Sequence, residues 1–151
     1  MKIFTDGSSL SNSKEAPAGS AVYFVELDKT ISYKFIGTNN QAELLALDLA
    51  LWYLFKNNYS TDDEYLFYLD SEYVIKIATK VNKPRSNQSL TESILKKLAK
   101  LSNYRFIHVK AHTKNIDDVS KWNDIVDKLA KKRAQEMKEE LARSGVTSSR
   151  T

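Results

Sequence analysis

The chain has 151 residues, of which 42% are hydrophobic and 28% are charged, values that are typical of one soluble globular domain. It contains no cysteine, which excludes thiol catalysis, zinc–thiolate clusters and a disulfide framework. The net charge of +4 is small, and the longest apolar stretch, residues 42–55, is interrupted by Glu43 and Asp48. We therefore expect a cytoplasmic, intracellular protein with no signal peptide, no membrane-spanning helix and no membrane partner.

The first part of the chain predicts antiparallel β-structure. Residues 3–4 form a strand that ends at the turn residues Asp6-Gly7-Ser8, and a polar loop follows over residues 9–17. Two runs rich in β-branched and aromatic residues, 20–27 and 31–36, are joined by Asp28-Lys29, which predicts a hairpin.

The rest of the chain alternates between helices and strands. Leucines on nearly every side of residues 41–56 predict a buried helix, and the apolar run 65–69 predicts a strand covered on both faces. A short helix over 71–79, a loop over 80–87, an amphipathic helix over 89–101 and a last strand over 104–110 follow. After a loop over 113–120, a helix over 121–143 turns Trp122, Ile125, Val126, Leu129 and Met137 inward. This order predicts one mixed sheet with helices packed on it, in a single domain over residues 1–143 with a flexible tail over 144–151.

The basic residues are concentrated in one part of the chain. Residues 76–110 contain nine lysines and arginines and a single acidic residue, Glu92. This composition suits a polyanionic partner. It equally suits a solvated surface that keeps the protein soluble.

Four carboxylates stand where the predicted layout makes a charge costly, and each has a structural explanation. Asp6, at the end of the first strand, fits an Asx turn, and Asp70, before a helix, fits an N-cap. Glu43 stands three residues after Asn40, as in a capping box. Asp127 lies on the margin of the apolar stripe of the last helix, where a solvated side chain is common.

Taken together, the four carboxylates indicate a metal site. The ends of the first and fourth strands can lie side by side in such a sheet, and helices packed nearby can bring Glu43 and Asp127 to the same pocket. Unpaired carboxylates at that separation repel one another and raise one another's pKa values, so cations must neutralise them at neutral pH. Oxygen ligands without a thiolate favour Mg²⁺ or Mn²⁺.

Five motifs, in this order, resemble those of the type 1 ribonuclease H enzymes, which cut the RNA strand of RNA–DNA hybrids. They are Asp6-Gly7-Ser8, the segment 38–44 (TNNQAEL), Leu69-Asp70-Ser71, the segment 109–112 (VKAH) and the segment 123–130 (NDIVDKLA). Each motif is weak alone, but five in the right order on the expected elements make a chance match improbable. The resemblance implies an α/β, ribonuclease H-like fold: a five-stranded mixed sheet of three antiparallel strands followed by two parallel additions, with helices on both faces.

The resemblance also implies a mechanism. Asp6, Glu43, Asp70 and Asp127 would be the catalytic and metal-binding carboxylates, with Asp6 shared between two Mg²⁺ ions, for which Mn²⁺ can substitute. One ion would activate a water for in-line attack and the other would stabilise the departing 3′ oxygen, at a separation of about 3.5–4 Å. The products would carry 5′-phosphate and 3′-hydroxyl ends.

The chain has two histidines, and we expect different roles for them. His108 lies within the last predicted strand, where most histidines are packing residues. His112 lies just after it, and the resemblance implies that it assists proton transfer and product release. Fifteen positions separate His112 from Asp127, more than in the commonest bacterial pattern, and residues 115–121 have the composition of additional loop. The position of His112 relative to the carboxylates is therefore open.

Substrate contacts follow from the same resemblance. Asn12, Asn39 and Gln41 would line the minor groove and contact ribose hydroxyls or base edges. Thr38 and Asn87 would bind a phosphate of the DNA strand, although cap chemistry explains these two residues equally well. The basic residues of 76–110 would follow the backbone of the hybrid, and we expect the protein to act as a monomer.

Two alternatives to a hybrid-cutting ribonuclease remain at this stage. One is a non-catalytic nucleic-acid-binding module with this fold, which would have no reason to keep four repelling carboxylates. The other is a different nuclease of the ribonuclease H-like superfamily, such as a strand-transfer or junction-resolving enzyme. Asn12 and the Asn39-Asn40-Gln41 segment favour recognition of a hybrid.

Overall fold

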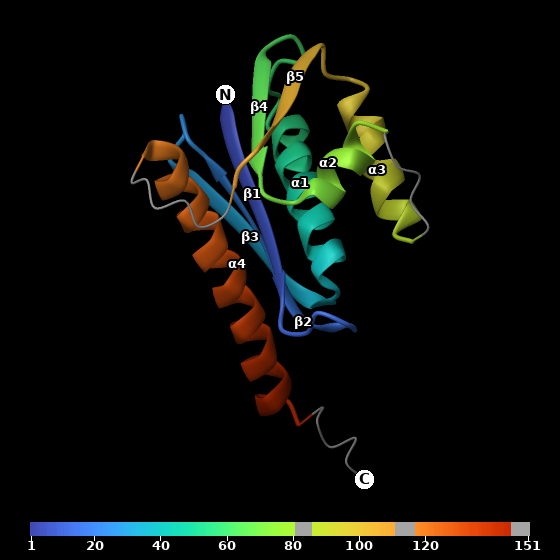
Figure 1. Ribbon diagram of the computed structural model, residues 1–151, viewed down its shortest axis with the longest axis vertical. Coiled ribbons are helices and arrows are strands. Elements are labelled where there is room, and N and C mark those ends of the chain that lie inside the picture. The colour runs from blue at the N-terminus through green and yellow to red at the C-terminus, as the bar shows by residue number, and fades with distance from the viewer. Residues whose placement is uncertain (81–85, 111–116, 146–151) are drawn as a thin grey trace.

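The computed structural model describes residues 1–80, 86–110 and 117–145. Its centre is a five-stranded sheet with the strand order β3-β2-β1-β4-β5 (Figure 1). β1 (Lys2–Ser9), β2 (Ala16–Phe24) and β3 (Lys29–Gly37) pair antiparallel, whereas β4 (Glu64–Leu69) and β5 (Asn103–His108) are added in parallel on the other side of β1. The predicted mixed sheet is confirmed.

Helices cover both faces of this sheet. α1 (Asn39–Lys56), α2 (Glu72–Ala78) and α3 (Gln88–Leu98) lie on one face, and α4 (Asp118–Arg143) crosses the other and extends past the strands (Figure 1). Each face has its own apolar cluster, one built around the leucines of α1 and the other around Val126 and Ala130 of α4. Among the residues that the structure describes, no helix is long and apolar enough to cross a membrane.

α1 is buried on most of its circumference, as the spread of its leucines predicts. Its buried residues recur in every turn: Ala42, Leu44, Ala46, Leu47, Ala50, Leu51 and Leu54. Trp52 is an exception, with 46% of its surface exposed. The helix begins at a capping box in which the Thr38 side chain accepts from Gln41 N and the Gln41 side chain accepts from Thr38 N, so two backbone N–H groups at the helix start are satisfied.

α4 packs closely against β2. A Cβ atom added at Gly19 would lie 2.2 Å from the carbonyl oxygen of Ala130, so only glycine allows this approach. Val126, Ala130 and Ala134 form the buried stripe of the helix. Trp122 packs edge-on against Phe4, with 5.7 Å between the ring centroids. These contacts hold α4 against β1 and β2.

Several predicted boundaries are wrong. The helix predicted over 89–101 ends at Leu98, and the strand predicted over 104–110 ends at His108. β1 does not stop at Asp6, because Gly7, Ser8 and Ser9 continue to pair with β2, which itself begins inside the predicted loop 9–17. α4 begins at Asp118, not at residue 121, because the Asp117 side chain caps it by accepting from Ser120 N at 2.8 Å. Residues 118–121 of the predicted extra loop therefore belong to α4. His112, residues 113–116, residues 81–85 of the loop 80–87 and residues 146–151 of the predicted tail lie outside the described residues.

Candidate active site

The sheet topology places two acidic residues side by side. β1 and β4 are parallel neighbours, with Phe4 paired to Tyr68, and two residues further along each strand stand Asp6 and Asp70. Asp6 remains within β1, whereas Asp70 is the first residue after β4. The carboxyl end of β4 therefore delivers Asp70 to the middle of the sheet, beside Asp6.

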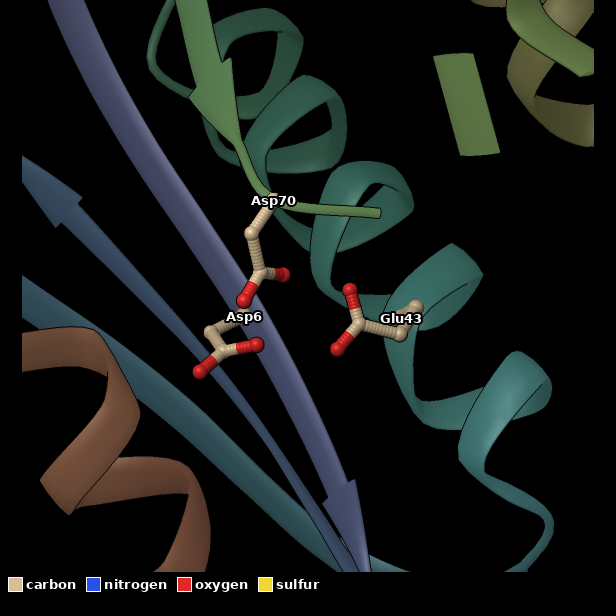
Figure 2. A group of neighbouring side chains, drawn as sticks. All are labelled: Asp6, Glu43 and Asp70. Carbon is tan, nitrogen blue, oxygen red and sulfur yellow. The ribbon is translucent and has the colours of Figure 1, made fainter. Parts of the chain in front are cut away.

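α1 supplies a third carboxylate to the same place. Asp6, Glu43 and Asp70 each have a carboxylate oxygen, and these oxygens all lie within 4.8 Å of one another. Figure 2 shows the three side chains directed toward one another, from β1, from α1 and from the end of β4. Among the described residues this is the one group of acidic or histidine side chains found close enough to hold a metal ion.

Gly7 makes the contact between β1 and α1 possible. Its N–H donates to Asp6 Oδ1 at 2.9 Å and to Glu43 Oε1 at 3.0 Å, and thereby links the two carboxylates. A Cβ atom at this position would lie 2.2 Å from the carbonyl carbon of Ala42. Any other residue would push the helix, and Glu43 with it, away from the strand.

A buried hydroxyl fastens the helix at the same level. Ser20, which pairs with Gly7 across the β1–β2 ladder, is fully buried and donates to the carbonyl oxygen of Ala42 at 2.7 Å. This bond attaches the sheet to the residue immediately before Glu43. Sequence analysis missed Ser20 and the close approach at Gly7, since both depend on which residues of α1 lie above the strands.

The electrostatics of the three carboxylates are unfavourable without a counter-charge. Burial raises the pKa of Asp6 from 3.8 to about 7, and the negative charges of Asp70 and Asp127 act in the same direction. Burial and the charge of Asp6 raise the pKa of Glu43 well above its usual range. Close carboxylates with raised pKa values are stabilised by a shared proton or by a cation. The oxygen-only donor set fits Mg²⁺ or Mn²⁺.

The structural explanations for Glu43 and Asp70 do not hold. The capping box of α1 is formed by Thr38 and Gln41, and Glu43 takes no part in it. The N-cap of α2 is Ser71, whose hydroxyl accepts from Val74 N at 3.2 Å, and not Asp70. The Asx turn proposed for Asp6 also fails as the end of a strand, because β1 continues to Ser9.

Asp127 stands close to the cluster without belonging to it. Its side chain is 38% exposed and forms an ion pair with Lys131, one turn along α4, at 3.2 Å. Its charge nevertheless contributes to the raised pKa of Asp6. The partial exposure of Asp127 agrees with the predicted position on the margin of the apolar stripe.

His108 is not the packing residue that was expected. It is exposed at the end of β5, and its Nε2 lies 3.1 Å from the main-chain oxygen of Asp70. The prediction failed because β5 is an edge strand of the sheet, and its residues are exposed or only half-buried along its whole length.

The predicted substrate residues fall into two groups. Asn12 and Asn39 are in contact, since Asn39 Nδ2 donates to Asn12 Oδ1 at 2.9 Å and Asn39 Oδ1 accepts from Ser9 N at 2.7 Å. The loop after β1 and the start of α1 therefore present their amides together. Thr38 and Gln41, by contrast, bond to each other in the capping box.

Asn87 is one of the residues that line a cavity. It occupies the N-cap position of α3 in the left-handed conformation, with φ 60° and ψ 33°, and its side chain makes no capping hydrogen bond. Cap chemistry therefore does not account for this side chain. Asn87 and Gln41 both line a cavity of ≈ 470 Å³ between β3, α1 and α3.

The basic residues of 76–110 are not all exposed. Lys76, Lys80, Lys96, Lys100 and Lys110 are exposed. Lys97 instead donates to Asp48 Oδ1 and to Ser93 Oγ, both at 2.7 Å, and so joins α3 to α1. Lys83 and Arg85 lie in the part of the chain that is not described.

Comparison with known proteins agrees with this architecture. The family model RNase H matches residues 1–135. RNase H1 from the halophilic archaeon Halobacterium salinarum NRC-1 has a TM-score of 0.71 at 22% identity, with 89% of this chain and 97% of that chain covered. The N-terminal RNase H domain of Rv2228c from Mycobacterium tuberculosis, solved as a fusion with maltose-binding protein, has a TM-score of 0.69 at 19% identity, covering 92% and 97%.

A third similar structure is LC11-RNase H1 in complex with an RNA/DNA hybrid, with a TM-score of 0.67 at 23% identity, covering 89% of this chain and 96% of that chain. No curated protein matched. The fold is that of solved RNase H1 proteins, and the family model extends over most of the chain, so the chain belongs to the ribonuclease H family.

Proposed function

We propose that this ribonuclease H hydrolyses the RNA strand of RNA–DNA hybrids with two divalent cations and leaves 5′-phosphate and 3′-hydroxyl ends. The observation that carries the proposal is the convergence of Asp6, Glu43 and Asp70, whose oxygens lie within 4.8 Å of one another. The similar LC11-RNase H1 was solved with an RNA/DNA hybrid, which supports the same class of substrate here.

The residues present fit Mg²⁺, with Mn²⁺ as a substitute. Asp6, Glu43 and Asp70 would hold one cation, and Asp6 with Asp127 the second. Divalent ions bound there supply Lewis-acid stabilisation of the scissile phosphate and lower the pKa of an attacking water. Asp127 is paired with Lys131 through Oδ2, and an exposed ion pair of this kind is worth at most about 1 kcal/mol, so it does not prevent Asp127 from binding a cation.

The rest of the chain prepares this site. Gly7 N–H holds Asp6 and Glu43 at a fixed separation, and Ser20 fixes the start of α1 above the sheet. Because these groups are positioned before a ligand arrives, less binding energy is spent on ordering them. His112 would assist proton transfer and product release.

Substrate recognition would use the amides near the start of α1. The paired Asn12 and Asn39 side chains sit at the end of β1, where they support contacts to ribose hydroxyls, the feature that distinguishes RNA from DNA. At the start of α1, Gln41 would contact the minor groove. Thr38, at the same helix start, and Asn87, at the start of α3, would contact a phosphate of the DNA strand. Exposed lysines of α2 and α3 supply the nonspecific attraction to the backbone.

A strand-specific cleavage assay tests the proposal. The substrate is an RNA–DNA hybrid labelled on either strand, assayed with Mg²⁺ beside single-stranded RNA, double-stranded RNA and double-stranded DNA, with a chelator as the control. We expect cutting of the RNA strand of the hybrid alone, abolished by the chelator. Binding without cutting, with Mg²⁺ or Mn²⁺, would instead indicate a binding module, and cutting of DNA would indicate another nuclease of the superfamily.

A further inference from the structure

The ends of the parallel strands β4 and β5 lie next to each other at the candidate site. Leu69 pairs with His108, and Val109 N donates to the Leu69 carbonyl oxygen at 2.9 Å. One residue beyond Leu69, the main-chain oxygen of Asp70 lies 3.1 Å from Nε2 of His108. The imidazole thus contacts the backbone of one of the three clustered carboxylates.

Asp70 belongs to neither of the elements that flank it. β4 ends at Leu69, and α2 begins at Glu72 after its N-cap Ser71. The peptide group between Asp70 and Ser71 therefore lies between a strand ladder and a helix, and it sets the direction in which the Asp70 side chain leaves the backbone. A donor on the oxygen of this peptide restricts its rotation.

We infer that His108 is a positioning residue for Asp70: its Nε2–H donates to the Asp70 carbonyl oxygen and keeps the Asp70 carboxylate directed toward Asp6 and Glu43. The inference rests on the proposed function, in which these carboxylates bind divalent cations. A carbonyl oxygen only accepts, so Nε2 must carry a proton. Both the neutral Nε2–H tautomer and the imidazolium satisfy this requirement.

Because His108 is exposed, a positioning role can be distinguished experimentally from a contribution to the hydrophobic core. An exposed side chain contributes little to the apolar clusters, so its replacement is expected to leave the fold intact. Groups that orient metal ligands from outside the coordination sphere typically contribute 10- to 100-fold to metal affinity or activity. Because His108 contacts the backbone of Asp70 and not its carboxylate, we expect an effect on Mg²⁺ affinity near the lower end of this range, about tenfold.

Three variants test the inference. His108→Leu removes the donor. His108→Gln restores an N–H at the end of a side chain of similar reach. Asn103→Leu, at the other and exposed end of β5, is the matched control. For each protein, Mg²⁺ binding is measured by calorimetry without substrate, the melting temperature is measured in chelator, and hybrid cleavage is measured as a function of Mg²⁺ concentration.

We expect His108→Leu to weaken Mg²⁺ binding by about tenfold, with a matching rise in the Mg²⁺ concentration needed for cleavage and an unchanged melting temperature in chelator. His108→Gln should recover most of the affinity, and Asn103→Leu should behave as wild type. Equal Mg²⁺ affinity in His108→Leu and wild type would overturn the inference, as would a lowered melting temperature that accounts for the loss. A wild type that does not bind Mg²⁺ would overturn the proposed function itself.

Discussion

Replacing Asp6 with Asn should stabilise the metal-free protein at alkaline pH, although it removes a proposed metal ligand. Asp6 is 6% exposed, and burial raises its pKa from 3.8 to about 7. In the unfolded chain the group titrates near 4, so between about pH 4 and pH 7 the folded state binds a proton that the unfolded state has lost. The stability contributed by this proton is complete below about pH 4 and disappears as the pH rises through about 7.

The size of the effect follows from the same pKa. A rise from 3.8 to about 7 corresponds to about 4 kcal/mol of destabilisation at pH 8 if Asp6 titrated alone. Asp6 and Glu43 interact, so the cost is shared and we expect Asp6→Asn to recover about 2 kcal/mol. The asparagine oxygen can still accept from Gly7 N. For a chain of this length, that gain raises the melting temperature by roughly 4–8 °C.

Thermal unfolding in chelator at pH 8 and pH 5 measures this gain. Asp6→Asn should melt above wild type at pH 8, and the difference should be less than half as large at pH 5, where the wild-type pair still holds its proton but the unfolded chain has already lost it. Asp48→Asn is the control: Asp48 is paired with Lys97 at 2.7 Å, so its loss should lower stability. An Asp6→Asn protein that is no more stable than wild type at pH 8 would refute the reasoning.

Four further predictions concern the same region. Mg²⁺ binding at pH 6 should release a proton, because the ions displace the one held at Asp6, whose pKa is raised to about 7; calorimetry in buffers of different ionisation enthalpy measures the number released. Gly7→Ala should cost about 3 kcal/mol of unfolding free energy in urea, since the added methyl meets the backbone of Ala42. Ser20→Ala should cost about 1 kcal/mol in the same experiment, the contribution of one hydrogen bond. Asp127→Asn should reduce hybrid cleavage while Lys131→Ala does not, since only Asp127 is a proposed ligand; initial rates at saturating Mg²⁺ distinguish the two.

The sheet and the central helix were predictable because their patterns are repetitive. The apolar run 65–69 and the leucines of α1 each extend over several residues, and the burial they require is what the structure shows. Isolated turn residues were less informative. Asp6-Gly7-Ser8 has the composition of a turn, yet it lies within β1, because pairing with β2 continues to Ser9 and overrides the local preference.

The acidic residues of the candidate site were found from the sequence, whereas the groups that hold them in place were not. Asp6, Glu43 and Asp70 follow from motif order and from the parallel pairing of β1 with β4. The contact of Ser20 with Ala42 and that of His108 with Asp70 join residues 22 and 38 positions apart. Neither pair has a local pattern, so only the assembled fold shows them.

The most direct test of the central claim compares the clustered carboxylates with Asp48, a carboxylate of α1 outside the cluster. Cleavage of an RNA–DNA hybrid in Mg²⁺ is measured for wild type, Asp6→Asn, Glu43→Gln, Asp70→Asn and the control Asp48→Asn. Each of the three cluster variants should lose activity by more than about 100-fold, the upper range for residues that only support a metal ligand, while Asp48→Asn stays active. Cleavage by Asp70→Asn at the wild-type rate would contradict the assignment of this cluster as the metal-binding active site.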